Sequence, residues 1–470
     1  MNRGITEFLK KHAEKNPVWF HMPGHKGEEI FVENGYKDFT EHMINGDITE
    51  IQGADNLFQT EGIILNTMNR YKAIYGTEKS YLLINGSSAG LIAAILASVK
   101  PGHKLIMARN CHKSVFNGIR LAGARPVYIY PETIDAYGIS GEIRADEVKK
   151  ALEENPDSDA VIVTSPNYYG ICSDIRAIAE AVHREGKILI VDQAHGAHLG
   201  LFEKFTGNKV LSAENQGADI VINSIHKTLA SFTQTAIANL CTDKMDPYRF
   251  EDCLQMIEST SPSYLLMASL DMNAGIIEKN GEKLIRNWDE NLKFFYEEAE
   301  KIKGLRVLHH PMLDYTKLNL DMSAYGINGL ELEQMLIKEK IFVELVTGNI
   351  LMCMTGIGNK RCDYERLLFA LKHIAETHEQ VSAEIKEKPQ CFKLKKVIQK
   401  DVPRDTERIP VEKAAGRVCG NSIIPYPPGI PIISPGEVMD KEILQYVKDL
   451  RAKGQKVMGI DEEGCVVAGK

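Results

Sequence analysis

Short apolar runs alternate with longer amphipathic stretches between about residues 80 and 240. The apolar runs are rich in Val and Ile and have the length of strands: 104–108, 125–130, 159–164, 187–192 and 219–224. The stretches around them have the period and length of helices: 89–99, 113–122, 143–154 and 175–185. Strands and helices that alternate at this spacing predict a mostly parallel sheet covered on both faces, in a doubly wound α/β domain.

The segments on either side of this core have a different pattern. Residues 1–60 are rich in Gly, His and Asn, and residues 259–304 have a helical pattern with a long helix expected from about Ala274. A charged stretch, 378–400, leads to a Pro-rich segment, 423–435. We therefore predict four parts: an amino-terminal segment (1–60), a large α/β domain (61–304), a small α/β domain (305–385) and a carboxyl-terminal domain (386–470).

Composition narrows the class of protein. The chain has 44% hydrophobic and 26% charged residues, enough apolar material for a sizeable core. Its net charge of −8 argues against a general nucleic-acid binder. The apolar run 91–99 is too short to cross a bilayer, and the amino terminus lacks the pattern of a secretion signal. Nine scattered cysteines without CxxC spacing suggest neither a zinc site nor a disulfide framework, so we expect a reduced, soluble, cytoplasmic protein.

Three motifs follow expected strands, at the sheet edge where α/β proteins bind ligands. The first contains Asn85, Gly86, Ser87 and Ser88 before an apolar helix. Small residues and free N–H groups at a helix start attract a phosphate, although an ordinary serine cap explains the motif equally well. The segment matches neither the P-loop nor the dinucleotide fingerprint.

The second motif is Asp192, which ends an expected strand and is followed by His195 and His198. A buried carboxylate needs a cation or a hydrogen-bond donor as a partner. A salt bridge or helix cap is the structural alternative, and a metal site with both histidines is a third, less favoured option.

The third motif contains Ser224, His226 and Lys227 after the last expected strand. Such a lysine could be solvated, or it could form a Schiff base. Together, a phosphate loop, an acid and a lysine are the three groups that pyridoxal phosphate requires, for its phosphate, its pyridine nitrogen and its aldehyde.

At this point the chain resembles the fold-type I, pyridoxal-phosphate-dependent ornithine/lysine/arginine decarboxylase family. The resemblance rests on four sets of residues spread over almost the whole chain: His21-Met22-Pro23-Gly24-His25-Lys26-Gly27; Asn110-Cys111-His112-Lys113-Ser114 with the segment from Asp192 to His195; Ser224-Ile225-His226-Lys227-Thr228 with Thr233-Gln234; and Pro425-Tyr426-Pro427-Pro428-Gly429-Ile430-Pro431 with Pro435-Gly436-Glu437.

The resemblance implies a role for each of these residues. Lys227 binds the cofactor covalently, Asp192 pairs with the pyridine nitrogen, and His112 stacks on the ring opposite Ala194. The residues expected to hold the phosphate are Ser87, Ser88, Ser224 and His226. Asn167 is expected near the ring hydroxyl. Lys227 or His226 would return the proton to Cα.

The basic end of the substrate calls for a carboxylate. The candidates are Glu437, after the Pro-rich segment, and Asp55, which a second copy of the chain could contribute across a dimer interface. Their structural alternatives are a surface acid after a turn and a solvated loop acid. Because short members of the family include arginine decarboxylases that feed polyamine synthesis, the resemblance implies conversion of arginine to agmatine, with lysine next and ornithine third.

The family's larger enzymes carry an amino-terminal domain used in assembly, whereas here the HMPGHK motif begins at residue 21. We therefore expect a homodimer or homotetramer rather than a large ring. Two rival functions stay open. A fold-type I aminotransferase would share the Asp and Lys but would usually need an arginine for the substrate carboxylate, and a silent regulator could keep the fold without activity.

Overall fold

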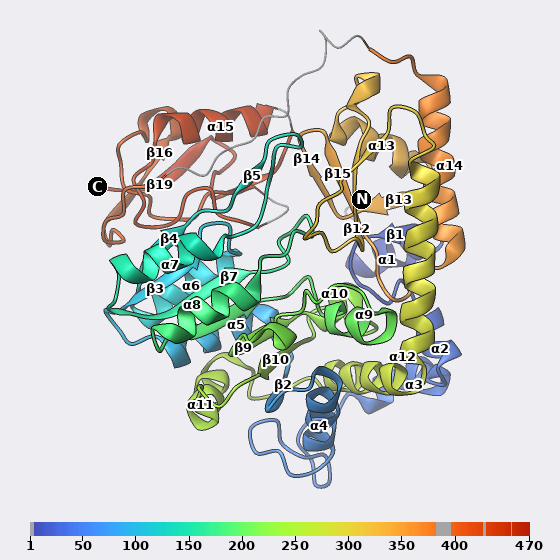
Figure 1. Cartoon of the computed structure of the whole chain (residues 1–470), viewed down its shortest axis with the longest axis horizontal. Helices are drawn as coiled ribbons and strands as arrows, with labels where there is room; N and C mark the ends of the chain where they lie inside the picture. Colours follow the sequence, from blue (N-terminus) through green and yellow to red (C-terminus); the bar gives the residue numbers. More distant parts are fainter. Residues whose placement is uncertain (1–3, 382–395, 426–428, 453) are drawn as a thin grey trace.

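A seven-stranded sheet forms the centre of the chain (Figure 1). The computed structural model describes residues 4–381, 396–425, 429–452 and 454–470. The strands lie in the order β2-β10-β9-β8-β7-β3-β4. Their bounds are β2 (Lys79–Leu83), β3 (Lys104–Ala108), β4 (Arg125–Ile129), β7 (Ser158–Thr164), β8 (Ile188–Asp192), β9 (Ile220–Asn223) and β10 (Ala236–Leu240). The contiguous strands β4, β3, β7, β8 and β9 are parallel, and β10 runs antiparallel to both β9 and β2. The predicted α/β fold with a mostly parallel sheet is confirmed.

Helices cover this sheet, and two of them, α5 and α6, pack so closely that one position at their contact requires a glycine. They include α4 (Ile63–Tyr75), α5 (Gly86–Ser98), α6 (Lys113–Ala122), α7 (Ala145–Glu154), α8 (Ile175–Arg184), α9 (Leu199–Thr206) and α11 (Pro247–Ile257). The sequence of α5 is apolar almost throughout because most of its residues are buried. A side chain at Gly118 of α6 would come within 2.7 Å of Ile95 of α5, so a glycine permits this close contact.

The long helix expected from Ala274 begins ten residues earlier. Helix α12 runs from Tyr264 to Ala299. Ser263 caps it by accepting a hydrogen bond from the backbone N–H of Leu266, and this capping signal fixes the start. The helix extends past the large sheet to α14 (Arg361–Thr377), as Figure 1 shows.

A second, four-stranded antiparallel sheet lies beside the first. Its order is β11-β12-β15-β14, with β11 (Arg306–Val307), β12 (Lys317–Asp321), β14 (Leu345–Thr347) and β15 (Ile350–Met354). We call it the small sheet. Helix α13 (Gly329–Lys338) leads to β13 (Ile341–Val343), which pairs in parallel with β1 (Val18–Phe20). The amino-terminal segment is thereby joined to β13, which follows α13 and precedes β14 of the small sheet.

The carboxyl-terminal part has a hydrophobic core of its own. It contains β16 (Thr406–Pro410), β17 (Ile424–Pro425), α15 (Lys441–Ala452), β18 (Val457–Met458) and β19 (Cys465–Gly469). The Arg109 side chain, at the end of β3, donates to the backbone oxygens of Pro431 and Ile432 at 2.6 and 2.8 Å. Residues 426–428 of the Pro-rich motif lie outside the described residues. The four domain boundaries stay predictions.

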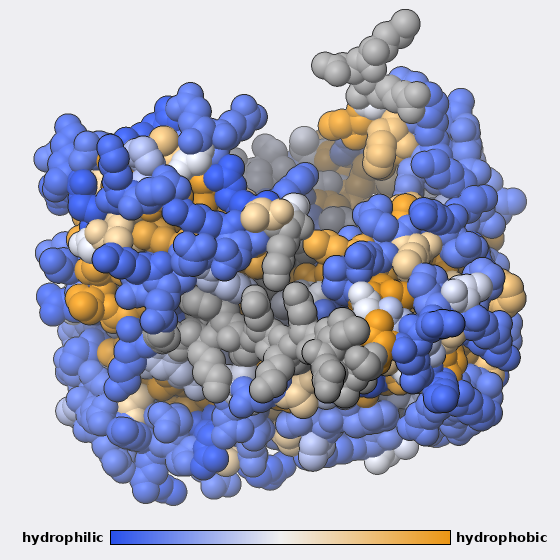
Figure 2. Space-filling view, turned by 90° about the horizontal axis from the view of Figure 1, so that it is seen from above, coloured by the Kyte–Doolittle hydropathy of each residue, from blue (hydrophilic) through white to orange (hydrophobic). Residues whose placement is uncertain are grey.

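The remaining elements are α1 (Ile5–Ala13), α2 (Glu29–Glu33), α3 (Lys37–His42), β5 (Thr133–Ile134), β6 (Ile139–Ser140) and α10 (Ile225–Thr228), together with short 3-10 turns. Figure 2 shows one face of the molecule, on which hydrophilic residues dominate and hydrophobic patches are small and separated. Within the described part of the chain, none of the helices has the length and apolar character needed to span a membrane.

Candidate active site

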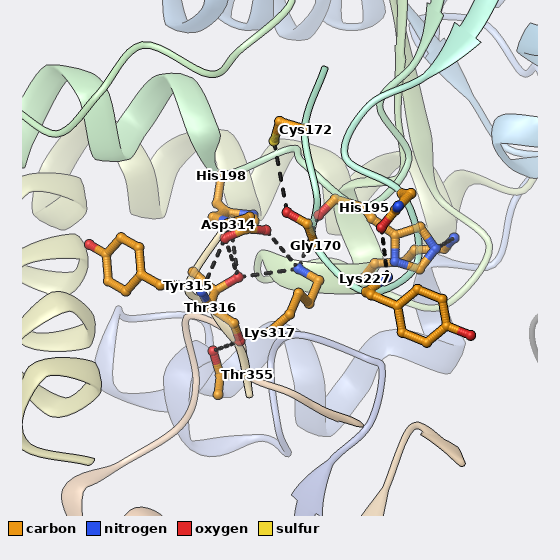
Figure 3. Close-up of polar contacts among 12 residues, drawn as sticks. Gly170, Cys172, His195, His198, Lys227, Asp314, Tyr315, Thr316, Lys317 and Thr355 are labelled. Atoms are coloured by element: carbon orange, nitrogen blue, oxygen red, sulfur yellow. Dashed lines mark hydrogen bonds and ion pairs between the residues drawn. The ribbon is translucent and has the colours of Figure 1, made fainter. Parts of the chain in front are cut away.

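The ends of β8 and β9 bring Asp192, His195 and Lys227 into one region. Asp192 is the last residue of β8, and Lys227 lies in α10, directly after β9. Because β8 and β9 are parallel neighbours, both segments leave the same edge of the sheet. The Lys227 Nζ atom lies 2.9 Å from His195 Nε2 (Figure 3).

The environment of Lys227 favours a neutral amine. Burial lowers the pKa of Lys227, and the cation of Lys317 acts in the same direction, while the carboxylates of Asp192 and Glu344 oppose the change. A lysine with a lowered pKa carries more of the uncharged, nucleophilic amine at neutral pH.

Asp192 is almost fully buried, with 3% of its surface exposed. Its Oδ1 atom accepts a hydrogen bond from the backbone N–H of Ala194 at 3.1 Å. Burial raises the pKa of Asp192, and the nearby Lys227 partly opposes this. A carboxylate held in this way has a strong demand for a further cationic partner, as a protonated ring nitrogen would supply.

An anion cradle lies at the start of α5. Gly86 has a φ of +79°, which lets the chain turn from β2 into the helix, and Ser87 and Ser88 occupy the first turn. Ser224 Oγ is buried and finds no hydrogen-bond partner among the described residues. Gln234 Nε2 donates to the oxygen of Ile84 at 2.6 Å, and a side chain on Gly86 would meet the backbone oxygen of Gln234 at 3.4 Å. The Ser224 hydroxyl lies at the start of α10, the segment that carries Lys227, and a buried hydroxyl without a partner among the described residues fits a phosphate group.

His226 is held by its backbone surroundings. Its Nδ1 atom lies 2.8 Å from the carbonyl oxygen of Thr235 and therefore carries the proton. Burial lowers the pKa of His226 to about 4, so the ring is neutral with Nε2 as an acceptor. A bound phosphate would favour a second proton on this ring, which would then donate through Nε2.

His112 caps α6. Its Nδ1 atom accepts from the backbone N–H of Ser114 at 3.3 Å and lies 2.9 Å from the Ser114 hydroxyl. Burial and the cation of Lys227 lower the pKa of His112 to about 3, so its ring is neutral. A neutral, flat ring suits stacking on a cofactor, and its placement opposite Ala194 stays a prediction.

The HMPGHK motif packs against α10, the segment that contains Lys227. The Gly24 N–H donates to the oxygen of His226 at 2.7 Å, and a side chain on Gly24 would collide with the backbone of Thr228. Lys26 Nζ donates to the oxygens of His21 and Met354 at 2.5 and 3.1 Å. Burial lowers the pKa of Lys26 to about 7. The motif thus packs the amino-terminal segment against α10.

Glu344, between β13 and β14, is a site residue that the sequence did not reveal. Its carboxylate accepts from the backbone N–H of Met22 at 3.0 Å and from the Tyr168 hydroxyl at 2.9 Å. Burial raises the pKa of Glu344, while Lys227 and Lys26 oppose the change. A signal was present, since Glu344 is the one acid within the apolar run from 341 to 346.

His195 and Tyr168 are two further residues without a predicted role in cofactor binding. Their ring centroids are 4.5 Å apart, with the planes tilted by 55°. Tyr168 thereby connects His195, beside Lys227, with Glu344 from the small-sheet side. The partner of His198, offered above as a metal ligand, is Asp314, at 3.1 Å from its Nε2 atom.

The structure does not support Glu437 as the residue that receives the substrate. It is buried, and its Oε2 atom accepts from Arg109 Nη2 at 2.9 Å and from the N–H of Ser434 at 2.8 Å. The Arg109 guanidinium already balances the charge of this carboxylate. The pair links Glu437, in the carboxyl-terminal part, to the end of β3.

Asp55 also has a structural role within this chain. Its carboxylate accepts hydrogen bonds from four backbone N–H groups, those of Asn56, Glu61, Gly62 and Ile64. Burial acts to raise the pKa of Asp55, but these four donors lower it overall. The carboxylate therefore organises the loop before α4.

Asn167 is likewise fully engaged with the backbone. Its amide nitrogen donates to the oxygens of Ser140 and Gly141 at 2.9 and 3.1 Å, and its oxygen accepts from the N–H groups of Tyr169 and Ile171 at 3.0 and 3.1 Å. All of its hydrogen-bonding capacity is used. In this structure the amide serves the backbone around it, and its place near a ring hydroxyl stays a prediction.

Comparison with known families decides the identity. A sequence model described as "Orn/Lys/Arg decarboxylase, major domain" matches residues 4–319, and one described as "Orn/Lys/Arg decarboxylase, C-terminal domain" matches residues 377–466. The chain belongs to the Orn/Lys/Arg decarboxylase family. Membership implies an amino-acid decarboxylase that uses pyridoxal phosphate, as the sequence predicted, and the groups around Lys227 fit that cofactor.

Individual relatives agree with this placement. A protein named arginine decarboxylase from Bacillus subtilis (strain 168) is 32% identical over 97% of this chain and 94% of its own length. The solved structure of the E. coli constitutive lysine decarboxylase has a TM-score of 0.77 and 20% identity, and covers 99% of this chain and 81% of that chain. Serine palmitoyltransferase from Sphingomonas wittichii has a TM-score of 0.57 and 14% identity, over 77% of this chain and 88% of that chain. Both structures share the fold.

Proposed function

We propose that this decarboxylase acts on arginine and releases carbon dioxide and agmatine. The observation that carries the proposal is the position of the Lys227 amine, near the buried carboxylate of Asp192 and after the same strand as the orphaned Ser224 hydroxyl. These three groups match the aldehyde, ring nitrogen and phosphate of the cofactor. Arginine is favoured because the relative that is 32% identical over nearly the full chain is named arginine decarboxylase.

The residues of the chain would divide the work as follows. Lys227 holds the cofactor, the Gly86–Ser88 turn and Ser224 hold its phosphate, and Asp192 keeps a proton on its ring nitrogen. When bound, pyridoxal phosphate supplies an electron sink for the Cα–carboxylate bond of the substrate. Lys227 or His226 returns a proton to Cα.

Glu344 is our candidate for the basic end of the substrate, in place of Glu437 and Asp55. Its carboxylate raises the pKa of Lys227. The Tyr168 hydroxyl and the Met22 N–H donate hydrogen bonds to this carboxylate and hold it in place. A carboxylate can accept a bidentate guanidinium, and it can pair with the ammonium of lysine or ornithine as well. Lysine and ornithine therefore stay the second and third candidates.

We further propose a homodimer or homotetramer that works in the cytoplasm and feeds polyamine synthesis. Apolar side chains are exposed on α1, where Ile5, Phe8 and Leu9 are 79%, 62% and 57% exposed. Ile44 and Ile51 of the same amino-terminal segment, and Ile63 at the start of α4, are exposed as well. Together they support an interface between copies of the chain.

Product analysis tests the proposed function. Purified protein loaded with pyridoxal phosphate is incubated separately with arginine, lysine and ornithine, and carbon dioxide and the amine product are measured. We expect carbon dioxide and agmatine from arginine at the highest kcat/KM. A keto-acid-dependent exchange of amino groups without carbon dioxide would instead indicate an aminotransferase, and no turnover of any substrate would indicate a silent regulator.

A further inference from the structure

A buried ion pair lies behind His195, between the large sheet and the small sheet. Lys317, the first residue of β12, has 0% of its surface exposed. Its Nζ atom donates to the backbone oxygen of His195 at 3.2 Å, to Asp314 Oδ2 at 3.1 Å and to Thr316 Oγ1 at 3.2 Å (Figure 3). A buried ammonium is costly unless its three donors have acceptors and its charge has a partner, and here both conditions are met.

Asp314 fixes the other end of the same turn. Its Oδ1 atom lies 3.1 Å from His198 Nε2, and its backbone N–H donates to the oxygen of Gly170 at 2.7 Å. The turn from 195 to 198 follows β8 and precedes α9. The ion pair therefore holds this turn at both ends, through the backbone at His195 and through the ring at His198.

This turn carries the ring that touches Lys227. His195 Nε2 is 2.9 Å from Lys227 Nζ. The carbonyl oxygen of the same histidine accepts the hydrogen bond from Lys317. The titratable and charged groups that act on Lys227 come from five different segments: Asp192, His195, His112, Glu344, His226 and Lys317. Among them Lys317 forms an ion pair with Asp314, and its charge acts against a proton on Lys227.

We propose that Lys317, with Asp314 as its counter-ion, is a positioning residue that fixes His195 against the Lys227 amine and keeps that amine reactive. The proposal rests on the function proposed above, since it takes Lys227 as the cofactor lysine. A buried ion pair is not in general an efficient stabiliser compared with apolar residues of the same size. The ion pair instead holds the turn from 195 to 198 in place, and this turn orients the His195 ring.

The test measures the reactivity of Lys227 in the full-length protein freed of cofactor. The rate at which acetic anhydride acetylates Lys227 is followed from pH 6 to pH 10 by mass spectrometry of the peptide that contains it. A second readout is the affinity for pyridoxal phosphate, measured by absorbance. The variants are Lys317→Met and the double variant Asp314→Asn/Lys317→Met, which removes both charges so that no carboxylate is left unpaired.

We expect the midpoint of the labelling profile to move to higher pH in both variants, with the rate below the midpoint falling by roughly threefold to tenfold. Affinity for pyridoxal phosphate falls with it. The matched control is Asp219→Asn, which removes a buried carboxylate at the opposite end of β8, where Asp219 accepts from the N–H of Leu189 at 2.8 Å. This control keeps the wild-type midpoint.

A folded double variant with the wild-type midpoint would overturn the proposal, as would an equal shift in the Asp219→Asn control. If Lys317→Met does not fold, the double variant decides. A wild-type chain that takes up no pyridoxal phosphate contradicts the proposed function, and this inference falls with it. Uptake by the wild type together with an unshifted double variant contradicts this inference alone.

Discussion

At the scale of the residue, burial and charge act in opposite directions on a few side chains of the site. Lys227, Asp192 and Glu344 are each shifted toward the neutral form by burial, and each partly restores the charge of an opposite neighbour. In such a cluster burial opposes the charge of each group, while its neighbours of opposite charge favour that charge. Buried clusters of this kind are typical of sites that move protons.

Glu344 gives a residue-scale prediction. We expect Glu344→Gln to raise KM for arginine by roughly tenfold to a hundredfold, because a charged hydrogen-bonded partner is lost, while the affinity for pyridoxal phosphate changes little. Steady-state kinetics and an absorbance titration of the cofactor check the two quantities. Glu339→Gln, at the end of α13 and exposed, is the matched control.

The same residue predicts a pH dependence. Burial raises the pKa of Glu344, and only its ionised form attracts a cationic substrate. In the wild type, kcat/KM should therefore fall as the pH drops through this raised pKa, and the Glu344→Gln variant should lack that fall. An unchanged KM in the variant would remove Glu344 from the substrate site.

Several residues of the site could be predicted from the sequence, and others could not. Lys227, Asp192 and Ser224 follow or end strands that their Val- and Ile-rich patterns identify, so the edge they share follows from the order of strands and helices. A sequence does not reveal that Arg109 binds the carboxylate of Glu437, or that four backbone N–H groups bind that of Asp55, so the substrate roles of these two acids stay predictions. Glu344 lies far along the chain from Met22 and Tyr168, and only the fold joins them.

At the scale of the element, the parallel strands were predictable and the antiparallel strand β10 was not. The strands β3, β7 and β8 are buried on both faces, so their sequences are nearly continuous apolar runs. Strand β10 runs antiparallel between β9 and β2 and has the sequence Ala-Ile-Ala-Asn-Leu, in which Asn239 is buried. The Asn239 side chain accepts a hydrogen bond from the hydroxyl of Ser80 in β2. Because Ser80 is distant along the chain, the local sequence does not show that this polar residue can be buried in a strand.

Asp55 gives a prediction at the scale of the loop before α4. We expect Asp55→Ala to lower the free energy of unfolding by about 1–3 kcal/mol, because four backbone N–H groups lose their acceptor, with unchanged KM for arginine. Thermal or urea unfolding measures the first quantity and steady-state kinetics the second. Asp55→Asn keeps one oxygen acceptor and should have a smaller effect. A raised KM in a fully stable Asp55→Ala variant would instead support a substrate role.

At the scale of the whole molecule, the exposed apolar residues of the amino-terminal region predict self-association. We expect Phe8→Glu/Leu9→Glu to shift the protein from dimer or tetramer toward monomer, because two charges would be buried at the interface. Light scattering coupled to size-exclusion chromatography measures the mass. Phe369→Glu on α14, where Phe369 is 71% exposed, is the control and should keep the wild-type mass. A monomeric wild-type protein would contradict this prediction.

Borohydride reduction identifies the lysine that carries the cofactor. The full-length protein is loaded with pyridoxal phosphate, reduced with sodium borohydride and digested, and the modified peptide is identified by mass spectrometry. We expect the phosphopyridoxyl group on Lys227, and its loss in Lys227→Ala but not in Lys279→Ala, a variant at an exposed lysine of α12. A label on another lysine, or on none, would contradict it.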